Sequence, residues 1–218
     1  MTGFSSNEWS PPTGFTNPSV SDTSETQCAL VAALHEVGNV DRALYQAIAV
    51  TPTPTLDEPL RQLSRAANNS LLWLAIAAAI AATGGRRARR AATVGIAALT
   101  IDSAIVNLVL KPMRDRARPA RVAAGVPEHR QVPMPSSSSF PSGHSASAFA
   151  FATAVSGTQP QLAVPMRALA TAVAYSRVHT GVHYPSDVVV GSLVGAIIGE
   201  AAALTARTLR HRRRLAHD

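Results

Sequence analysis

The chain has 218 residues, a length typical of one domain with tails, and its single cysteine, Cys28, excludes an internal disulfide framework. Its net charge is +7, and among its 20 basic residues every one except Lys111 is an arginine. No aromatic residues are interleaved with the basic runs and no nucleic-acid-binding motif accompanies them, so nucleic acid is not an expected partner. The apolar share of 46% and the mean hydropathy of +0.10 fit either a membrane protein or a soluble one.

The first third of the chain carries two different patterns. Residues 1–27 are rich in Pro, Ser, Thr and Gly, which predicts a disordered tail, and they lack the basic-then-apolar order of a cleavable signal peptide. Residues 28–67 form an amphipathic helical region, because apolar residues recur near helical spacing over 28–50 with charged residues between them. Three prolines between positions 52 and 59 interrupt this helix before residues 60–67 resume it. We expect the region to lie on a membrane surface or to pack on a bundle, and a crossing of the membrane is left open.

Five apolar spans follow within a domain of residues 68–207. They predict an all-α fold, an integral-membrane helical bundle with about five transmembrane helices, which is followed by a basic C-terminal tail of residues 208–218. Asp102 and Asn107 lie in the second span, and we expect one of them to bond a serine or threonine of a neighbouring helix, because polar groups in lipid need partners. The spans are residues 70–83, 91–110, 142–155, 168–176 and 188–206.

The last span has a face of small residues. Gly191, Gly195 and Gly199 recur every four residues and therefore line one side of a helix. In a soluble helix each of these glycines would cost about 1 kcal/mol, whereas in lipid such a face lets two helices approach closely. The pattern favours a membrane helix that packs tightly against a neighbour.

The arginine clusters indicate an orientation. Residues 86–90 follow the first span, residues 207–214 follow the last, and Arg167 lies between the third and the fourth. Counting the crossings places all three on the same side, which by the positive-inside tendency is the cytoplasm. The sequence therefore predicts a multi-pass protein of the cell membrane whose opposite, extracytoplasmic face carries the polar segments described next.

Three short segments on that face suit the binding of a phosphate group. Two of these segments supply three cations. An arginine guanidinium can donate two hydrogen bonds to the oxygens of one phosphoryl group, and a lysine adds a localised positive charge. The third is a Pro-Ser-Gly-His turn that opens an apolar stretch, which predicts a helix start whose free N–H groups favour an anion. The predicted phosphate-binding residues are Lys111, Arg118, Ser142, Gly143 and Arg177.

Two histidines complete the expected chemistry. His183 and Asp187 are spaced i,i+4, so on a helical turn both face the same way. A carboxylate bonded to one ring nitrogen fixes the tautomer and leaves the other nitrogen to attack phosphorus. His144 is then free to protonate the leaving group, a role that suits a side chain titrating near neutral pH.

The three segments, K-x6-R-P, P-S-G-H and S-R-x5-H-x3-D, resemble those of the type 2 phosphatidic acid phosphatase (PAP2) superfamily in order and in every defining residue. The resemblance covers roughly the second half of the chain. It implies a hydrolase acting on a lipid phosphate or diphosphate, of the phosphatidate or polyprenyl type, with His183 as the nucleophile that forms a phosphohistidine. It also implies Asp187 as the partner that orients His183 and His144 as the general acid. A polyprenyl carrier of bacterial cell envelope synthesis is one candidate substrate.

Alternatives within the same superfamily are a soluble acid phosphatase or a vanadium-dependent haloperoxidase. The bilayer-length spans argue against both, since soluble enzymes do not need them. A non-enzymatic protein that binds a lipid headgroup is a further alternative, which the complete set of motif residues disfavours. The oligomeric state is left open.

The remaining polar residues carry weaker signals. We expect the arginines near the first motif, Arg116 among them, to form a solvated basic loop, and steering of an anionic substrate is the alternative. His179 occupies a variable position of the third motif, so we expect it at the rim of the site. The sequence contains no cluster of His, Cys, Asp or Glu with metal-ligand spacing, so no metal or other cofactor is required.

Overall fold

The computed structural model of this chain describes residues 20–216, and within that range it contains helices and turns but no strand. The predicted all-α class is therefore confirmed. The chain divides into two compact units, residues 1–40 and 41–218. The fold of the second unit is described below, since it holds all the predicted site residues.

Helix α1, Val20–Val50, contains the helix that the sequence predicts over residues 28–50. Most of the predicted disordered tail, residues 1–19, lies outside the described residues. Its last part does not: residues 20–27 are helical, which corrects the prediction for them. The physical reason is that the last helix-breaking proline of this stretch is Pro18, so α1 can begin two residues later.

Helix α2, Pro54–Ala66, begins earlier than the sequence predicts. The break expected at the prolines is present, but it covers only the turn at residues 51–53. Pro54 occupies the first turn of α2, where its missing N–H costs nothing, and Pro59 is accommodated inside the helix. A short 3-10 turn, η1 (Asn68–Ser70), then leads into α3, Leu71–Thr83.

The second half of the chain contains the long helices. Residues 106–110 are a π-helical turn (η2), which continues α4 toward the first motif. Helix α8 extends through Leu215, so the predicted basic tail is helical over residues 208–215; arginine is a good helix former and is favourable near a helix C-terminus. The elements are α4 (Arg86–Ile105), η2 (Val106–Leu110), α5 (Lys111–Met113), η3 (Glu128–Arg130), α6 (Gly143–Thr158), η4 (Pro160–Leu162), α7 (Ala163–His179) and α8 (Pro185–Leu215).

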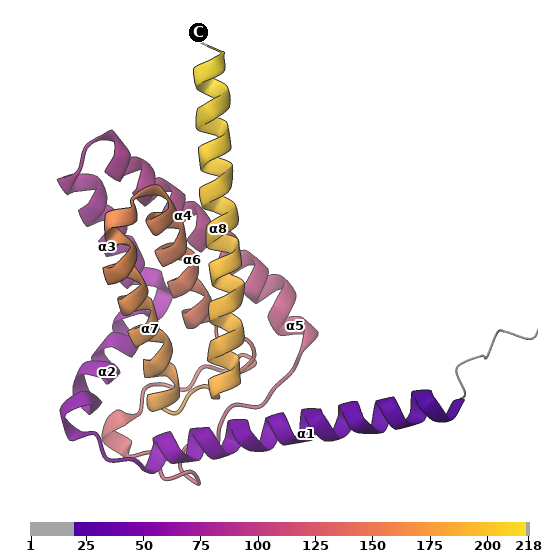
Figure 1. Cartoon of the computed structure of the whole chain (residues 1–218). Helices are drawn as coiled ribbons and strands as arrows, with labels where there is room; N and C mark the ends of the chain where they lie inside the picture. Colours follow the sequence, from indigo (N-terminus) through magenta and orange to yellow (C-terminus); the bar gives the residue numbers. More distant parts are fainter. Residues whose placement is uncertain (1–19, 217–218) are drawn as a thin grey trace, which may run out of the picture. The chain divides into compact units, whose positions relative to one another are not determined.

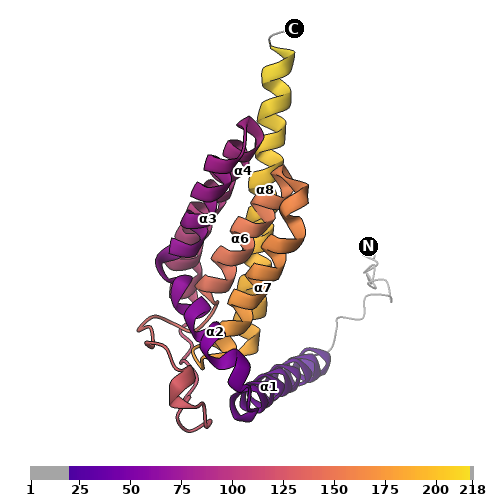
Figure 2. The same cartoon turned by 90° about the vertical axis from the view of Figure 1, so that its left-hand side faces the viewer.

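Helix α6 is the central element of the bundle. It packs against α4, α7 and α8, which surround it in Figures 1 and 2. The side chains of Trp73 and Phe151 are fully buried between α3 and α6, with ring centroids 5.4 Å apart. Much of the remaining core is alanine and valine, so the helices are closely spaced.

The glycine face of α8 lies directly on α6. A methyl group added to Gly195 would overlap the carbonyl oxygen of Ala146, and one added to Gly199 would lie 2.5 Å from the carbonyl oxygen of Ala150. The same step of four residues along both helices brings Gly191 against the backbone of Ser142. The close approach expected from the sequence is thus present, and it reaches the start of α6.

Two helices are long and apolar enough to cross a membrane within the described residues: Arg86–Met113 and Pro185–Leu215. The pair Pro54–Ala66 and Asn68–Thr83, bent by 69°, adds a third if it forms one broken span. Helices α6 and α7 have 16 and 17 residues, which is shorter than a typical crossing. Asp102 in α4 accepts a bond from the hydroxyl of Ser147 in α6 at 2.9 Å, so the expected interhelical bond is confirmed.

The bundle has two distinct ends. One end holds the start of α6, the start of α8 and the end of α7, together with the loop after α5, at the bottom of Figure 1. The other holds the α3–α4 turn, the α6–α7 turn and the last turns of α8. All eight predicted site residues belong to the first end and most arginines outside the motifs belong to the second.

Candidate active site

His183 lies in the turn between α7 and α8, and its side chain is only 2% exposed. Its Nε2 atom is 3.2 Å from a terminal nitrogen of Arg118. Because a guanidinium only donates hydrogen bonds, Nε2 must accept, and the ring proton belongs on Nδ1. Nδ1 faces Oδ2 of Asp187 at 3.6 Å. The lone pair of Nε2 is therefore directed toward the side of the ring where Arg118 lies.

The charge state of His183 follows from its surroundings. Burial lowers its pKa to about 4, the nearby carboxylate of Asp187 opposes this shift, and the charges of Arg177 and Arg118 add to it. The imidazole is consequently neutral at pH 7, which is the form that a nitrogen nucleophile requires.

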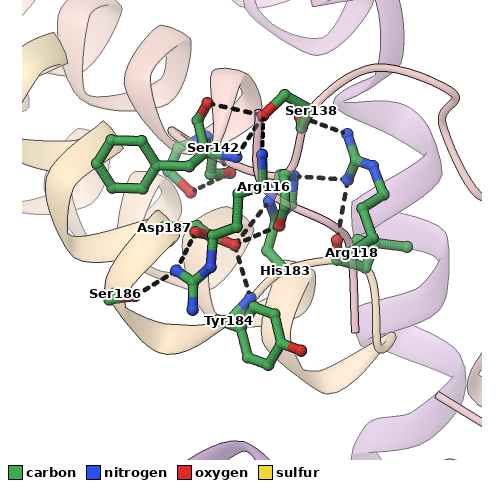
Figure 3. A network of polar contacts seen from close by, with 12 residues as sticks. Arg116, Arg118, Ser138, Ser142, His183, Tyr184, Ser186 and Asp187 are labelled. Atoms are coloured by element: carbon green, nitrogen blue, oxygen red, sulfur yellow. Dashed lines mark hydrogen bonds and ion pairs between the residues drawn. The ribbon is translucent and has the colours of Figure 1, made fainter. Parts of the chain in front are cut away.

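Asp187 is held in one orientation by several donors (Figure 3). Its side chain is fully buried in the first turn of α8. Oδ2 accepts bonds from the hydroxyl of Ser139 and from the backbone N–H of Tyr184, the latter at 2.9 Å. Oδ1 accepts a bond from Arg116 at 2.6 Å. With this many donors the carboxylate is fixed beside His183.

Arg116 corrects an expectation, because it does not belong to a solvated steering loop. One of its terminal nitrogens donates to Asp187 and the other to Asp41 of α1, each at 2.6 Å. The guanidinium also lies 4.3 Å from the centroid of the Tyr184 ring. Burial opposes the charged form, but hydrogen bonds and charges from Asp41 and Asp187 leave the pKa of Arg116 raised. This arginine connects two buried carboxylates, and no pattern in the sequence distinguishes it from its neighbours.

Arg118 is fixed by backbone carbonyls. It donates to the carbonyl oxygens of Ser137 at 2.9 Å, Ser138 at 3.2 Å and Val182 at 2.9 Å (Figure 3). These contacts join the loop before α6 to the turn that carries His183. The guanidinium is thus positioned before any substrate binds, which is favourable for stabilising charge that develops during a reaction.

The Ser142–Gly143 turn starts α6 as expected. Ser142 is the N-cap, and its hydroxyl accepts from the backbone N–H of Ser145 at 3.5 Å. Its own N–H donates to the backbone carbonyl of Asp187 at 3.0 Å, which ties this turn to α8. A methyl group on Gly143 would lie 3.8 Å from Nζ of Lys111, so Lys111 and the helix start face the same space.

Lys111 follows the π-helical turn at the end of α4. Its ammonium group donates to the side chains of Asn107 at 3.0 Å and Ser137 at 3.3 Å. Single π turns are frequent at functional positions, because the extra residue changes the direction of the side chains that follow. Here the turn lies immediately before the first residue of the K-x6-R-P motif.

Arg177 is buried near the end of α7 and is held by α2. One terminal nitrogen donates to both the hydroxyl and the carbonyl oxygen of Ser64, and the side chain is 1% exposed. Its Nε has no hydrogen-bond partner among residues 20–216. A buried guanidinium with an unused donor fits an anion-binding role.

His144 is oriented by a residue that the sequence did not indicate. Its Nε2 lies 2.8 Å from the side-chain oxygen of Asn68 in η1. With Lys111 and Gly143, His144 lines a cavity of about 250 Å³. Two further residues of the lining, Asn69 and Ser70, have φ of 52° and 60°, a strained conformation that is common at functional sites.

His179 is not at the rim of the site, contrary to expectation. It is 1% exposed, and its Nε2 lies 3.1 Å from Oδ1 of Asp57 and 2.9 Å from the hydroxyl of Thr53. Arg130 also pairs with Asp57 at 2.8 Å. This buried group attaches the end of α7 to α2. His179, at the variable position of the third motif, therefore stabilises the packing of α7, the helix that carries Arg177.

Comparisons with known proteins agree with this architecture. A family profile described as the PAP2 superfamily matches residues 91–211. A decaprenylphosphoryl-5-phosphoribose phosphatase of Mycobacterium tuberculosis is 36% identical over 151 residues, which is 69% of this chain and 81% of the relative. The protein of that name from Mycolicibacterium smegmatis is 38% identical over 135 residues, 60% of this chain and 68% of the relative.

Two solved structures share the fold. A transmembrane PAP2-type phosphatidylglycerolphosphate phosphatase from Bacillus subtilis superposes with a TM-score of 0.63 at 24% identity, covering 83% of this chain and 92% of that one. LpxE from Aquifex aeolicus gives a TM-score of 0.59 at 26% identity, covering 73% of this chain and 92% of that one.

The fold and these matches define a helical membrane phosphatase. The chain belongs to the PAP2 superfamily. The predicted class of enzyme, a membrane-bound lipid phosphatase, is thereby confirmed. The roles of the individual site residues stay predictions.

Proposed function

We propose that this protein is a multi-pass membrane enzyme that removes a phosphoryl group from a polyprenyl-linked lipid through a phosphohistidine at His183, without a metal ion. The observation that carries the mechanism is the environment of Nε2 of His183. This atom is unprotonated, is 3.2 Å from the guanidinium of Arg118, and belongs to a ring that faces the fixed carboxylate of Asp187.

In the first step Nε2 of His183 attacks phosphorus, and the bond from phosphorus to the leaving oxygen breaks. Lys111, Arg118 and Arg177 neutralise the phosphoryl oxygens, together with the backbone N–H groups at the start of α6. His144 donates a proton to the leaving oxygen, which departs as the lipid alcohol. The developing positive charge on His183 is stabilised by Asp187.

In the second step water attacks the phosphohistidine, and the bond between phosphorus and Nε2 breaks. His144, now neutral, accepts the proton of the attacking water, as reversal of the first step requires. Phosphate leaves, and His183 returns to its neutral form with the proton on Nδ1. No group outside the chain, water and substrate takes part.

The mycobacterial relatives support the substrate class. They are named for decaprenylphosphoryl-5-phosphoribose, a polyprenyl-linked phosphosugar, and this chain spans 81% of the first at 36% identity. We propose a substrate of that class, used in synthesis of a bacterial cell envelope. The alternative substrates to be compared with this polyprenyl-linked phosphosugar are phosphatidate, phosphatidylglycerol phosphate and polyprenyl diphosphates.

The proposed topology has five crossings with the site on the extracytoplasmic face. The bent α2–α3 pair, α4, α6, α7 and α8 would be the spans, and α6, the shorter of the two short helices, is surrounded by α4, α7 and α8. Both arginine clusters, residues 86–90 and 207–214, and Arg167 lie at the end of the bundle opposite His183, which by the positive-inside tendency faces the cytoplasm. An accessibility assay of single cysteines at each end in intact cells tests the orientation.

The test of function is phosphate release from a panel of these lipids by the full-length protein in detergent. His183→Ala is expected to abolish release, whereas His35→Ala, a change of an exposed histidine in α1, serves as the matched control. A phosphoryl label on the enzyme should be stable in alkali and labile in acid. Unchanged release by His183→Ala contradicts the mechanism, and recovery of the protein in buffer without detergent contradicts the membrane assignment.

A further inference from the structure

A second polar cavity lies at the end of the bundle opposite His183. It has a volume of about 710 Å³ and lies between the first turns of α4 and the last turns of α8, toward the top of Figure 1. Six arginines and one histidine line it, with backbone from the α6–α7 turn. The basic residues are Arg86, Arg87, Arg90, Arg207, Arg210, His211 and Arg214.

Among the described residues, the arginines of this cavity have no partner in an ion pair. Within residues 20–216 every ion pair lies elsewhere in the chain. Three of the arginines are held by backbone carbonyls instead: Arg87 by Thr158 at 3.3 Å, Arg207 by Gly157 at 2.9 Å, and Arg90 by residue 206. These three guanidinium groups are therefore held near one another, and a bound anion would relieve their mutual repulsion.

The start of α4 favours an anion at the same place. This 20-residue helix begins at Arg86; its N-cap, Gly85, has no side chain to cap it, and its first turn contains no acidic residue. Free N–H groups and the positive end of the helix dipole are thus directed to the end where the arginines gather. Arginines in a first turn oppose the dipole, so a bound anion would stabilise both features.

The surroundings of the cavity favour a lipid. An adjoining hollow of about 910 Å³ shares Arg90, Arg210 and Arg214 and adds Leu209, whose side chain is 53% exposed. Among the described residues, α4 with its continuation to Met113 and α8 are the helices both long and apolar enough to cross a membrane, so this site lies at the end of their apolar segments. A phosphate group in the arginine cavity would therefore have an apolar surface beside it for a hydrocarbon chain.

We propose that this cavity binds the phosphate-bearing headgroup of an anionic membrane lipid, at a site separate from the catalytic one. Six arginines match a headgroup with more than one phosphate better than one with a single phosphate. The proposal rests on the cavity itself and does not depend on which substrate the enzyme hydrolyses.

The experiment measures lipid binding to the full-length protein in detergent by native mass spectrometry and thermal unfolding. The probes are cardiolipin with two phosphates, phosphatidylglycerol with one, zwitterionic phosphatidylcholine, and free inorganic diphosphate. We expect cardiolipin to bind most tightly and to raise the unfolding temperature, phosphatidylglycerol to bind less tightly, and the other two to have no effect. Diphosphate that binds as tightly as cardiolipin would overturn the lipid assignment, and so would equal binding of phosphatidylcholine.

The variant Arg90→Gln/Arg210→Gln locates the site. It is expected to weaken cardiolipin binding at least about tenfold, since two charge-assisted contacts are lost, while Arg167→Gln, an exposed arginine outside the cavity, leaves it unchanged. Arg86→Gln/Arg214→Gln is a second pair that alters only exposed side chains, so its folding is not at risk. Retained phosphatase activity shows that the catalytic end is intact. Cardiolipin binding unaffected in both pairs refutes the proposal.

Discussion

The connection of Asp187 to Asp41 through Arg116 leads to a quantitative prediction. Replacing Arg116 with Gln removes two charge-assisted hydrogen bonds of 2.6 Å and leaves two carboxylates that are 0% and 5% exposed without their cation. Breaking a buried ion pair by removing one partner costs about 3–5 kcal/mol. Because Arg116 is itself 24% exposed, we take the lower bound, about 3 kcal/mol. For a chain of this size that corresponds to a fall in Tm of roughly 6–12 °C.

The same change should impair catalysis more than substrate binding. Arg116 contacts Asp187 and not the phosphate cations, so its loss removes one of the three donors that fix the carboxylate beside His183 and allows it to shift. A misplacement near 1 Å at the reacting group costs on the order of 100-fold in rate. We expect kcat to fall by about that factor while KM changes little, which is the pattern of an interaction needed in the transition state.

Thermal unfolding and steady-state kinetics in detergent test this reasoning. Arg114→Gln is the matched control, since Arg114 lies in the same loop, is exposed, and contacts the Phe140 ring instead of a carboxylate. Arg116→Lys keeps the charge but cannot bridge both carboxylates in the same geometry, so an intermediate loss is expected. Equal Tm and equal kcat for the Gln variants at 114 and 116 would refute the positioning role.

Further predictions concern pH, packing, metal dependence and the support of α7. On the acid side, kcat/KM should fall near pH 4, because His183 must be neutral to react and its pKa is lowered to about 4. Asp187→Asn removes a group that raises this pKa, so the fall in kcat/KM should move to lower pH, and kcat should decrease. Gly195→Ala should lower the free energy of unfolding by about 1–3 kcal/mol, because the added methyl group meets the backbone of α6. The control Gly85→Ala, with open space around the added methyl group, should change this free energy by less than about 1 kcal/mol. Equal Tm values for the two variants would contradict the packing argument. Vanadate should inhibit and EDTA should not, and strong loss of activity in EDTA would contradict a metal-free mechanism. Ser64→Ala removes the hydroxyl that accepts a hydrogen bond from Arg177 and should raise KM several-fold more than it lowers kcat; an unchanged KM would argue against Arg177 as a phosphate ligand.

The helices that the sequence predicts correspond to helices in the structure because their signals are local. The apolar run of residues 70–83, the glycine repeat of α8 and the Pro-Ser-Gly start of α6 each determine their element without distant contacts. The errors occurred where a boundary depends on weak local preferences. Proline in a first turn is compatible with a helix, so α2 begins at Pro54.

The supporting residues of the site could not be found in the same way. Asp41, Ser64 and Asn68 act on residues more than seventy positions away, and each is an ordinary polar residue in its own segment. Only the three-dimensional fold brings them to Arg116, Arg177 and His144. The motif residues themselves could be predicted, because their chemistry requires particular residue types at a fixed spacing. The expectations for Arg116, in a basic loop, and for His179, at the rim of the site, are wrong, because these side chains pair with carboxylates of other segments. The carboxylates are Asp41 and Asp187 for Arg116, and Asp57 for His179.

The bend between α2 and α3 couples two parts of the proposed chemistry. Ser64, just before the bend, holds Arg177, and Asn68, just after it, holds His144. A change in this bend would displace Arg177, the proposed anion ligand, and His144, the proposed proton donor, at the same time. A single mutation at the bend should therefore impair phosphate binding and proton donation together, although neither Arg177 nor His144 has been changed.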